Sequence, residues 1–327
     1  MKAQIQYGHV PGLAQPIARV VQGTTMLGTV LDEAESFALL DRVFELGVTT
    51  LDTAHVYGRG ACERMLGRWC AARGVRDELV ILGKGAHHNA ERRRVTPADI
   101  TADLHESLER LQTNHIDLYL LHRDDPTVPV EPLVDVLSQH QRAGLIGAYG
   151  GSNWTTARLR AANDYARANG LAPFVASSPQ FSLAEQVAEP WPETVSIGGA
   201  AHAQDRAWYA REQMAVFAWS SLAGGFFSGR YRPDNRDSHT TDADTLCLRA
   251  YGSDDNFRRL ERAEQLAHER GLTIAQVALA YVLNQPLNLF ALVGPFTAAE
   301  LEADVAAAAL ALTPAELAWL DLSADPR

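Results

Sequence analysis

The sequence predicts a closed parallel (β/α)8 barrel, an α/β fold of the TIM-barrel class. Short apolar runs rich in β-branched residues alternate with segments whose apolar residues recur at helical spacing. This alternation repeats eight times along 327 residues without a linker or a change of composition. Eight strand-then-helix units are the number that closes such a barrel. We therefore expect one domain, residues 1–327, with extra helices and long loops at the carboxyl ends of its strands.

The expected strands are short apolar runs, and they lie at 18–21, 48–52, 81–84, 116–122, 146–150, 174–178, 215–219 and 289–293. The expected helices are amphipathic, and they lie at 33–46, 62–73, 96 onward, 132–143, 155–169, 203–212, two after 254, 298 onward and 313 onward. Thr96 followed by Pro97, and the capping box that begins at Thr273, are helix-start signals. Residues 1–18 are expected to cover the bottom of the barrel, and residues 224–254 to form a long, turn-rich loop.

A doubly wound sheet is the main alternative fold. It would require a glycine-rich fingerprint after the first strand. The loop at that position reads Gly23-Thr24-Thr25, which is not such a fingerprint. The barrel is therefore favoured.

Composition narrows the class of protein. With 46% hydrophobic and 21% charged residues, the chain is typical of a globular protein with an ample core. A formal charge of -11 argues against nucleic acid and anionic membranes as partners. The three cysteines have no metal-ligand spacing and are expected to be reduced thiols. No apolar run is long enough to span a membrane, so a cytoplasmic protein is expected.

Four chemically matched residues fall at or just after the ends of successive predicted strands. Asp52 ends one strand, and Tyr57 follows on a glycine-rich loop. Lys84 ends the next strand and His122 the one after it. In a parallel barrel these strand ends meet on one face, where barrel enzymes place their chemistry. Taken singly, Tyr57 could be a rim residue, Lys84 a surface charge and His122 a core histidine, but the ordered set favours an active site.

The chain resembles the aldo-keto reductase family over nearly its whole length. The matching residues lie in order along it: Asp52-Thr53-Ala54, Tyr57-Gly58, Lys84, Leu121-His122, Gly151-Ser152-Asn153-Trp154, Gln180 and Trp219-Ser220-Ser221-Leu222-Ala223. The resemblance implies that Tyr57 is the general acid that protonates a substrate carbonyl. It also implies that Lys84, paired with Asp52, lowers the pKa of Tyr57, and that His122 orients the carbonyl.

These roles agree with elementary chemistry. A phenol whose pKa is near 10 is a poor acid–base catalyst at neutral pH, and an adjacent ammonium group stabilises its phenolate. Hydride transfer to a carbonyl leaves negative charge on oxygen, which hydrogen-bond donors stabilise. The family resemblance implies a small carbonyl or alcohol substrate and a nicotinamide cofactor as the hydride source.

The resemblance also assigns cofactor residues. Ser152, Asn153 and Gln180 would bind the nicotinamide carboxamide, and Trp219 would stack on the ring unless it is a core residue at the top of the barrel. Ser220, Leu222 and Gly224 would cover the pyrophosphate, and Gly23 and Thr24, in the loop after the first strand, are also assigned to the cofactor site.

The last of the strand-end loops departs from the family pattern. Around Gly294 the family binds the adenosine 2′-phosphate with hydroxyl and cationic side chains, whereas this chain has Thr297, Glu300 and Asp304. A carboxylate repels a 2′-phosphate and can accept a hydrogen bond from a 2′-hydroxyl. Glu300 could instead cap its own helix. The cofactor is therefore expected to be NADP or NAD, with NAD plausible.

The expected substrate pocket is mostly aromatic, with walls formed by His87, Trp154, Trp191, Phe226 and Phe227. Such walls suit a sugar face or a hydrophobic aldehyde equally well. His55 and His88 could also reach a substrate. Residues 123–125, an arginine and two aspartates, are expected to form a surface charge cluster, and no metal site is expected.

Two other functions stay open at this stage. The same fold could be a cofactor-binding regulatory subunit with little turnover, like the reductase-like subunits of potassium channels. It could also be a lyase or isomerase that uses Lys84 as a Schiff base. The sequence does not distinguish a monomer from a homo-oligomer.

Overall fold

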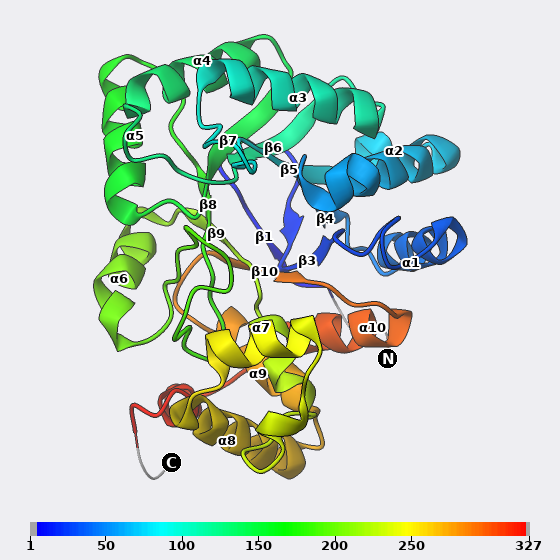
Figure 1. The fold of residues 1–327 in the computed structure, drawn as a ribbon, viewed down its shortest axis with the longest axis vertical. Coiled ribbons are helices and arrows are strands. Elements are labelled where there is room, and N and C mark those ends of the chain that lie inside the picture. Colours follow the sequence, from blue (N-terminus) through cyan, green and yellow to red (C-terminus); the bar gives the residue numbers. More distant parts are fainter. Residues whose placement is uncertain (1–4, 325–327) are drawn as a thin grey trace.

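A computed structural model describes residues 5–324 and contains a closed barrel of eight parallel strands. Around the barrel the order is β10-β3-β4-β5-β6-β7-β8-β9, so the first and last barrel strands pair and close the ring (Figure 1). The strands are β3 (Val20–Gly23), β4 (Thr50–Asp52), β5 (Val80–Gly85), β6 (Ile116–Leu121), β7 (Ile146–Ser152), β8 (Ala176–Ser178), β9 (Ala215–Ala218) and β10 (Leu289–Val293). The predicted fold class is confirmed.

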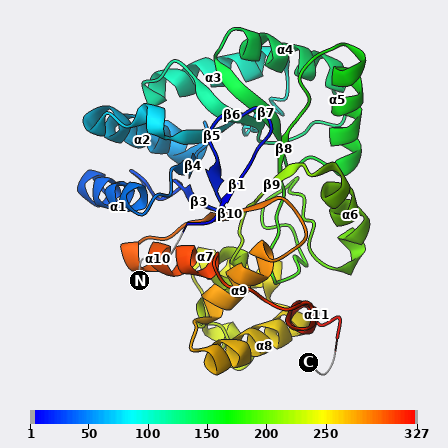
Figure 2. The same ribbon diagram turned by 180° about the vertical axis from the view of Figure 1, so that it is seen from behind.

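Helices surround the strands in both views (Figures 1 and 2). Their bounds are α1 (Glu33–Glu45), α2 (Ala61–Arg73), α3 (Pro97–Leu111), α4 (Val130–Arg142), α5 (Thr156–Ala168), α6 (Ala203–Glu212), α7 (Asp242–Tyr251), α8 (Asp254–Arg270), α9 (Ile274–Leu283), α10 (Ala298–Ala307) and α11 (Pro314–Leu320). Hydroxyl side chains cap several of them, and Thr96 accepts from the backbone of Asp99 as the sequence indicates. Within residues 5–324, no helix is long and apolar enough to cross a membrane.

The interior of the barrel is a packed apolar core. Side chains that point inward from the strands, among them Val80, Leu118 and Phe217, form one cluster with Val10 and Leu13. The latter two belong to the segment between β1 (Tyr7–Gly8) and β2 (Ile17–Ala18), which pair as an antiparallel hairpin. The hairpin segment therefore contributes side chains to the core inside the barrel.

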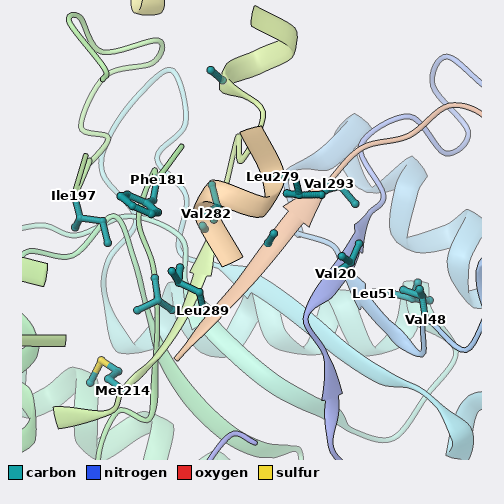
Figure 3. Packing of buried hydrophobic residues seen from close by; sticks show 14 of the residues in the cluster. Val20, Val48, Leu51, Phe181, Ile197, Met214, Leu279, Val282, Leu289 and Val293 are labelled. Atoms are coloured by element: carbon teal, nitrogen blue, oxygen red, sulfur yellow. The ribbon is translucent and has the colours of Figure 1, made fainter. Parts of the chain in front are cut away.

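A second and larger core lies between the strands and the helices. In Figure 3, Leu279 and Val282 of α9 lie beside β10, close to Leu289 and Val293. Each of these four side chains is at most 5% exposed. Burial on this scale contributes about 1.5–3 kcal/mol per large aliphatic side chain. This packing holds the strands in the positions from which their carboxyl ends present the site residues.

Two local expectations are corrected by the structure. Residues 224–254 are not one long loop, because they contain α7, which buries Cys247, Ala250 and Tyr251 on one face. Its N-cap is Thr241, whose hydroxyl accepts from the backbone of Asp244. The first expected strand, 18–21, also divides, because Ala18 belongs to β2, which pairs with β1, while the barrel strand β3 begins at Val20.

Candidate active site

The four predicted catalytic residues come from three neighbouring barrel strands, β4, β5 and β6. Asp52 ends β4, Lys84 is the penultimate residue of β5, and His122 follows β6 directly. The backbone N–H of His122 donates to the carbonyl of Gly85 at 2.7 Å, which extends the β5–β6 pairing by one residue. Tyr57 begins a 3₁₀ turn (Tyr57–Gly60) in which Gly58, Arg59 and Gly60 all have positive φ. This turn returns the phenol toward the strand ends.

Lys84 connects these residues. Its buried ammonium group forms an ion pair with the carboxylate of Asp52, and it donates to the carbonyl of Thr53 at 3.1 Å and to Tyr57 Oη at 3.3 Å. Lys84 and Asp52 are 2% and 4% exposed. A buried ammonium group needs such partners because the loss of hydration is expensive. The Lys84 side chain is thus fixed with one N–H directed at the phenol.

The site is arranged to keep Tyr57 protonated and Lys84 charged. Burial raises the pKa of Tyr57, and the nearby Lys84 charge opposes that rise without reversing it. Burial also acts against the charge of Lys84, yet Asp52 and Tyr57 raise its pKa overall. The expectation that Lys84 lowers the pKa of Tyr57 describes the direction of one contribution, but the net shift is upward.

His122 is a neutral imidazole in this environment. Burial first, and the charge of Lys84 second, hold its pKa well below the usual value. Its ring lies 5.7 Å from that of Tyr57 and 4.8 Å from that of His87, both edge-on. The Nδ1 atom is buried and has no hydrogen-bond partner among the described residues. Tyr57 and His122 thus present two groups that can donate hydrogen bonds side by side.

Asn153, which follows β7, links several of the loops at the carboxyl ends of the strands. Its backbone has a φ of 58°, in the left-handed region. Its Nδ2 donates to the carbonyl of His122 at 3.3 Å, and its Oδ1 accepts from the backbone of Val195 at 3.1 Å and from Trp219 Nε1 at 3.2 Å. Asn153 therefore connects the loop after β6 with the loops after β8 and β9.

The family model for the aldo/keto reductase family matches residues 19–324. The chain belongs to the aldo/keto reductase family.

Curated relatives agree with this assignment. The chain is 28% identical to "Uncharacterized oxidoreductase YrpG" of Bacillus subtilis (strain 168), over 94% of this chain and 92% of that protein. It is 32% identical to "Uncharacterized oxidoreductase Mb2320" of Mycobacterium bovis, over 94% and 90%. It is 25% identical to "Putative aryl-alcohol dehydrogenase AAD14" of Saccharomyces cerevisiae, over 89% and 77%. The chain is therefore an oxidoreductase of a family that generally uses NAD(P)H.

The loop after β9, which the family resemblance assigns to the cofactor phosphates, is rich in residues with positive φ. After β9, the residues Ser220, Ala223, Gly224 and Gly225 all have positive φ. Two of its backbone N–H groups are used within the loop, because Ala223 donates to the carbonyl of Ser220 at 2.7 Å and Gly225 donates to that of Leu222 at 3.1 Å. A Cβ placed on Gly225 would meet nothing within 4 Å, so there is open space on that side of the residue. Ser220 and Leu222 are half-buried on the same loop.

The polar side chains expected to bind the nicotinamide carboxamide are already hydrogen-bonded within the protein. Gln180 is fully buried, accepts from Ser196 Oγ at 2.7 Å and donates to Ser182 Oγ at 2.9 Å. Ser152 Oγ donates to the carbonyl of Ser178 at 3.0 Å. Trp219 is half-buried, and its ring lies 5.9 Å from that of Trp191. Of these residues, Trp219 has the most accessible side chain.

Gly23 and Thr24 lie where the barrel closes. A Cβ on Gly23 would lie 3.0 Å from the carbonyl oxygen of Val293, so glycine allows β3 and β10 to approach closely. The backbone N–H of Thr24 donates to the carbonyl of Asp52 at 3.0 Å, and its buried Oγ1 has no partner among the described residues. The backbone of Thr24 is thus hydrogen-bonded to that of Asp52, one of the four predicted catalytic residues.

Glu300 caps the N-terminus of α10. Its carboxylate accepts from the backbone N–H groups of Phe296 at 2.7 Å and Thr297 at 3.2 Å, while Thr297 Oγ1 accepts from the N–H of Glu300. The carboxylate of Glu300 therefore occupies the N–H groups of the two residues that directly precede α10 and places a negative charge at the start of that helix. Asp304 is buried one turn further along, where burial, with a contribution from Glu300, raises its pKa to about 7. Gly294 begins this loop and is exposed.

Three of the residues expected to line a substrate pocket lie in the core instead. Trp154 is fully buried, packs against Phe174 and donates from Nε1 to the carbonyl of Arg123 at 3.1 Å. Phe226 and Phe227 are also fully buried, and Phe226 packs against Phe257 of α8. Large apolar side chains between elements are usually buried, so an aromatic residue after a strand is a weak pocket signal.

His87 and Trp191 remain accessible near the site. His87 lies beside His122, and burial lowers its pKa to about 4, so it is neutral at physiological pH. Trp191 is 47% exposed. His55 faces away toward Glu106 and Asp103, with its Nε2 2.9 Å from the Glu106 carboxylate. No group of three or more His, Cys, Asp or Glu residues in the described chain could hold a metal ion.

The segment 123–125 is not the surface charge cluster that the sequence suggests. Arg123, Asp124 and Asp125 are 5%, 9% and 9% exposed. Charged residues are rarely buried, so nothing in the composition of this short run predicted it. The missed signal is its position directly after His122, because residues that follow barrel strands point into the active face.

Proposed function

We propose that this protein catalyses reversible hydride transfer between a nicotinamide cofactor and an aldehyde or ketone, with Tyr57 as the acid–base residue. The observation that carries the proposal is the contact of 3.3 Å between Lys84 Nζ and Tyr57 Oη, made where Lys84 is also paired with Asp52. A phenol beside a charged ammonium group and a neutral imidazole suits proton transfer to a carbonyl oxygen.

Each side chain has a definite task in the reduction. Tyr57 Oη donates its proton to the carbonyl oxygen, and Lys84 stabilises the phenolate that remains. His122 donates a hydrogen bond to the same oxygen and orients the carbonyl. Asp52 holds Lys84 in place and offsets its charge. The nicotinamide cofactor supplies the hydride in reduction and receives it in alcohol oxidation.

The cofactor that fits the last loop best is NADH. The 2′-phosphate of NADPH would meet the carboxylate of Glu300, which accepts from the N–H groups of Phe296 and Thr297 just before α10. In the part of the chain that the structure describes, residues 294–304 contain no lysine or arginine to offset that charge. A 2′-hydroxyl can instead donate to a carboxylate.

An aromatic part of the substrate is a reasonable match for the accessible side chains. Trp191 and Trp219 lie 5.9 Å apart at the active face. One relative is named as a putative aryl-alcohol dehydrogenase. We therefore propose aryl aldehydes as the first carbonyl compounds to assay.

The decisive experiment measures cofactor binding and turnover in the same preparation. Fluorescence titrations with NADH and NADPH should show tighter binding of NADH. A panel of benzaldehydes should then be reduced by the wild type. Tyr57→Phe should retain cofactor affinity within about threefold and lose about 10²–10⁴-fold in kcat, the range for a positioned acid–base residue.

Two outcomes would refute the proposal. If Tyr57→Phe turns over aldehydes as fast as the wild type, Tyr57 is not the proton donor. If neither nucleotide binds at high micromolar concentration, hydride transfer is excluded. Trapping with borohydride would then test Lys84 as a Schiff-base residue.

A further inference from the structure

Arg123 is a buried cation at the active face. It directly follows His122 and is 5% exposed. Its backbone carbonyl accepts from Trp154 Nε1 at 3.1 Å, and its own NH1 donates to the carbonyl of His122 at 3.0 Å. The ring of Trp154 and the backbone of His122 thus fix both ends of the residue. The guanidinium group is held against the loop that carries a catalytic residue.

The two acids that follow Arg123 in sequence have other partners. Asp124 forms a two-pronged ion pair with Arg158, at 2.9 Å for each oxygen. Asp125 accepts from Arg93 at 3.2 Å and from the hydroxyl of Thr127 at 2.7 Å. Neither carboxylate is directed at Arg123.

The acids on the facing loop are also engaged. Glu193 forms an ion pair with Arg93, and Glu189 accepts from the backbone N–H of Glu193 at 3.0 Å. Both carboxylates are close enough to favour the charged form of Arg123, although neither lies within the 4.0 Å of an ion pair. Among residues 5–324, no carboxylate forms an ion pair with Arg123, and its buried Nε has no hydrogen-bond partner.

A buried guanidinium group without a paired anion lowers the stability of the folded state. Burial lowers the pKa of Arg123, which reflects this loss of hydration. The charge also reaches the reaction centre, because it contributes to the pKa shifts of Tyr57, His122 and His87. An unsatisfied donor and a positive charge without an ion-pair partner therefore lie directly next to His122.

We propose that Arg123 binds a carboxylate group of the substrate, so that the preferred carbonyl compounds are anionic aldehydes or ketones. This inference rests on the proposed function, because it assigns a substrate class to the same site. The planar fork of arginine binds a carboxylate with two parallel hydrogen bonds. A phosphate dianion would need a second cation, and Arg93, which pairs with the facing loop, is already bound to Glu193 and Asp125.

The test compares two substrates that differ only in charge. Wild-type protein with saturating NADH is assayed with 4-formylbenzoate and with its methyl ester. We expect kcat/KM to be about 10–100-fold higher for the acid, as for other charge-assisted hydrogen bonds. Arg123→Met should bring this ratio close to one, and Arg123→Lys should give an intermediate ratio because the charge remains without the fork.

A matched control removes a different guanidinium group from the same face. Arg158→Met should keep the acid-to-ester ratio of the wild type, because the guanidinium group of Arg158 forms an ion pair with Asp124 and is not expected to bind substrate. If the wild type does not discriminate between acid and ester, or if Arg123→Met slows both equally, Arg123 only supports the His122 loop and the inference is wrong. Should Arg123→Met not fold, the ratio for Arg123→Lys decides.

Failure of the proposed function would give a different experimental result from failure of the carboxylate site. If the wild type reduces neither compound, hydride transfer is refuted, while the substrate class is still tested by calorimetric titration with 4-methylbenzoate and its methyl ester. Tighter binding of the acid that disappears in Arg123→Met supports the carboxylate site. Equal binding of the two overturns it.

Discussion

Lys84 Nζ lies 3.3 Å from Tyr57 Oη, and the two residues come from adjacent strand-then-helix units of the barrel. The pairing of β4 with β5 sets the distance between their backbones. The side chains then meet because the turn after β4 brings Tyr57 back over Lys84. The contact thus depends on strand register as well as on residue type.

Replacing Lys84 with methionine tests the electrostatic part of this contact. Loss of the ammonium group removes the interaction that opposes the rise in the pKa of Tyr57, so that pKa rises further. Alcohol oxidation needs the phenolate, and its rate should fall about 100-fold or more at pH 7. The measurement is the pH profile of kcat for oxidation, whose acidic limb should move to higher pH.

The companion variant separates catalysis from stability. Lys84→Met leaves Asp52 buried and unpaired, which costs about 3–5 kcal/mol for a broken buried pair. Adding Asp52→Asn should restore much of the stability in urea denaturation and none of the oxidation rate. An unmoved pH limb in the single variant would show that Lys84 does not act on Tyr57.

Glu300→Ala should change the cofactor preference. The substitution frees the N–H groups of Phe296 and Thr297 and removes a negative charge, so NADPH affinity should rise about tenfold relative to NADH. Loss of the capping interaction should cost about 1 kcal/mol of stability. Fluorescence titrations with both nucleotides provide the ratio.

The control for this variant is Glu302→Gln on the same helix, which removes a charge paired with Arg42 and leaves the helix-start N–H groups occupied. It should keep the wild-type ratio. An equal rise in both variants would show that only the net charge of α10 matters.

Asp304 should make the protein less stable as the pH rises. Its folded pKa is about 7, above the ordinary value of 3.8, so between about pH 4 and 7 the unfolded chain binds fewer protons than the folded one. Stability is therefore lost across that window, by up to about 4 kcal/mol. Asp304→Asn does not ionise and should be the more stable protein at pH 8, with little difference at pH 4. Urea denaturation at both pH values measures this, and a constant difference would exclude the titration.

Gly67→Ala should destabilise the protein although alanine is the better helix former. A Cβ on Gly67 would lie 2.6 Å from the carbonyl oxygen of Arg110 and 2.7 Å from the carbonyl carbon of Leu111, where α2 crosses α3. Helix propensity alone favours alanine by about 1 kcal/mol. Overpacking against backbone should reverse this and lower the free energy of unfolding by about 1–3 kcal/mol, measured by urea denaturation.

The control is Ala72→Ser, on the exposed face of α2, which should stay within about 0.5 kcal/mol of wild type in the same assay. A gain in stability for Gly67→Ala would show that α2 can move away.

The sequence predicts the barrel well because strand and helix periods differ sharply. Asp52, Lys84 and His122 could be placed at strand ends for the same reason. Helix α7 was missed because it is surrounded by turn residues and has a short apolar face of Cys247, Ala250 and Tyr251. Side-chain burial was harder to predict, since whether an aromatic residue such as Trp154 lines a pocket or fills the core depends on contacts with distant segments.

The protonation and charge pairing of the site residues were the properties hardest to predict from the sequence. A neighbouring ammonium group suggests a lowered pKa for Tyr57, yet burial outweighs it. Arg123 lies in a run of three charged residues, a pattern typical of a solvent-exposed surface. Only the three-dimensional structure reveals that Asp124 is paired with Arg158 and Asp125 with Arg93.

The pairing of β3 with β10 also has a consequence for biosynthesis. Gly23 contacts the backbone of Val293, so the two edges of the sheet are separated by about 270 residues of chain and join only after β10 has left the ribosome. Until then β3 and β9 expose unpaired backbone groups, which are sites for aggregation. The loop of Glu300, which follows β10, cannot approach the residues of the first strands before closure. Closure of the ring is therefore a late step that requires the chain through β10 to be complete.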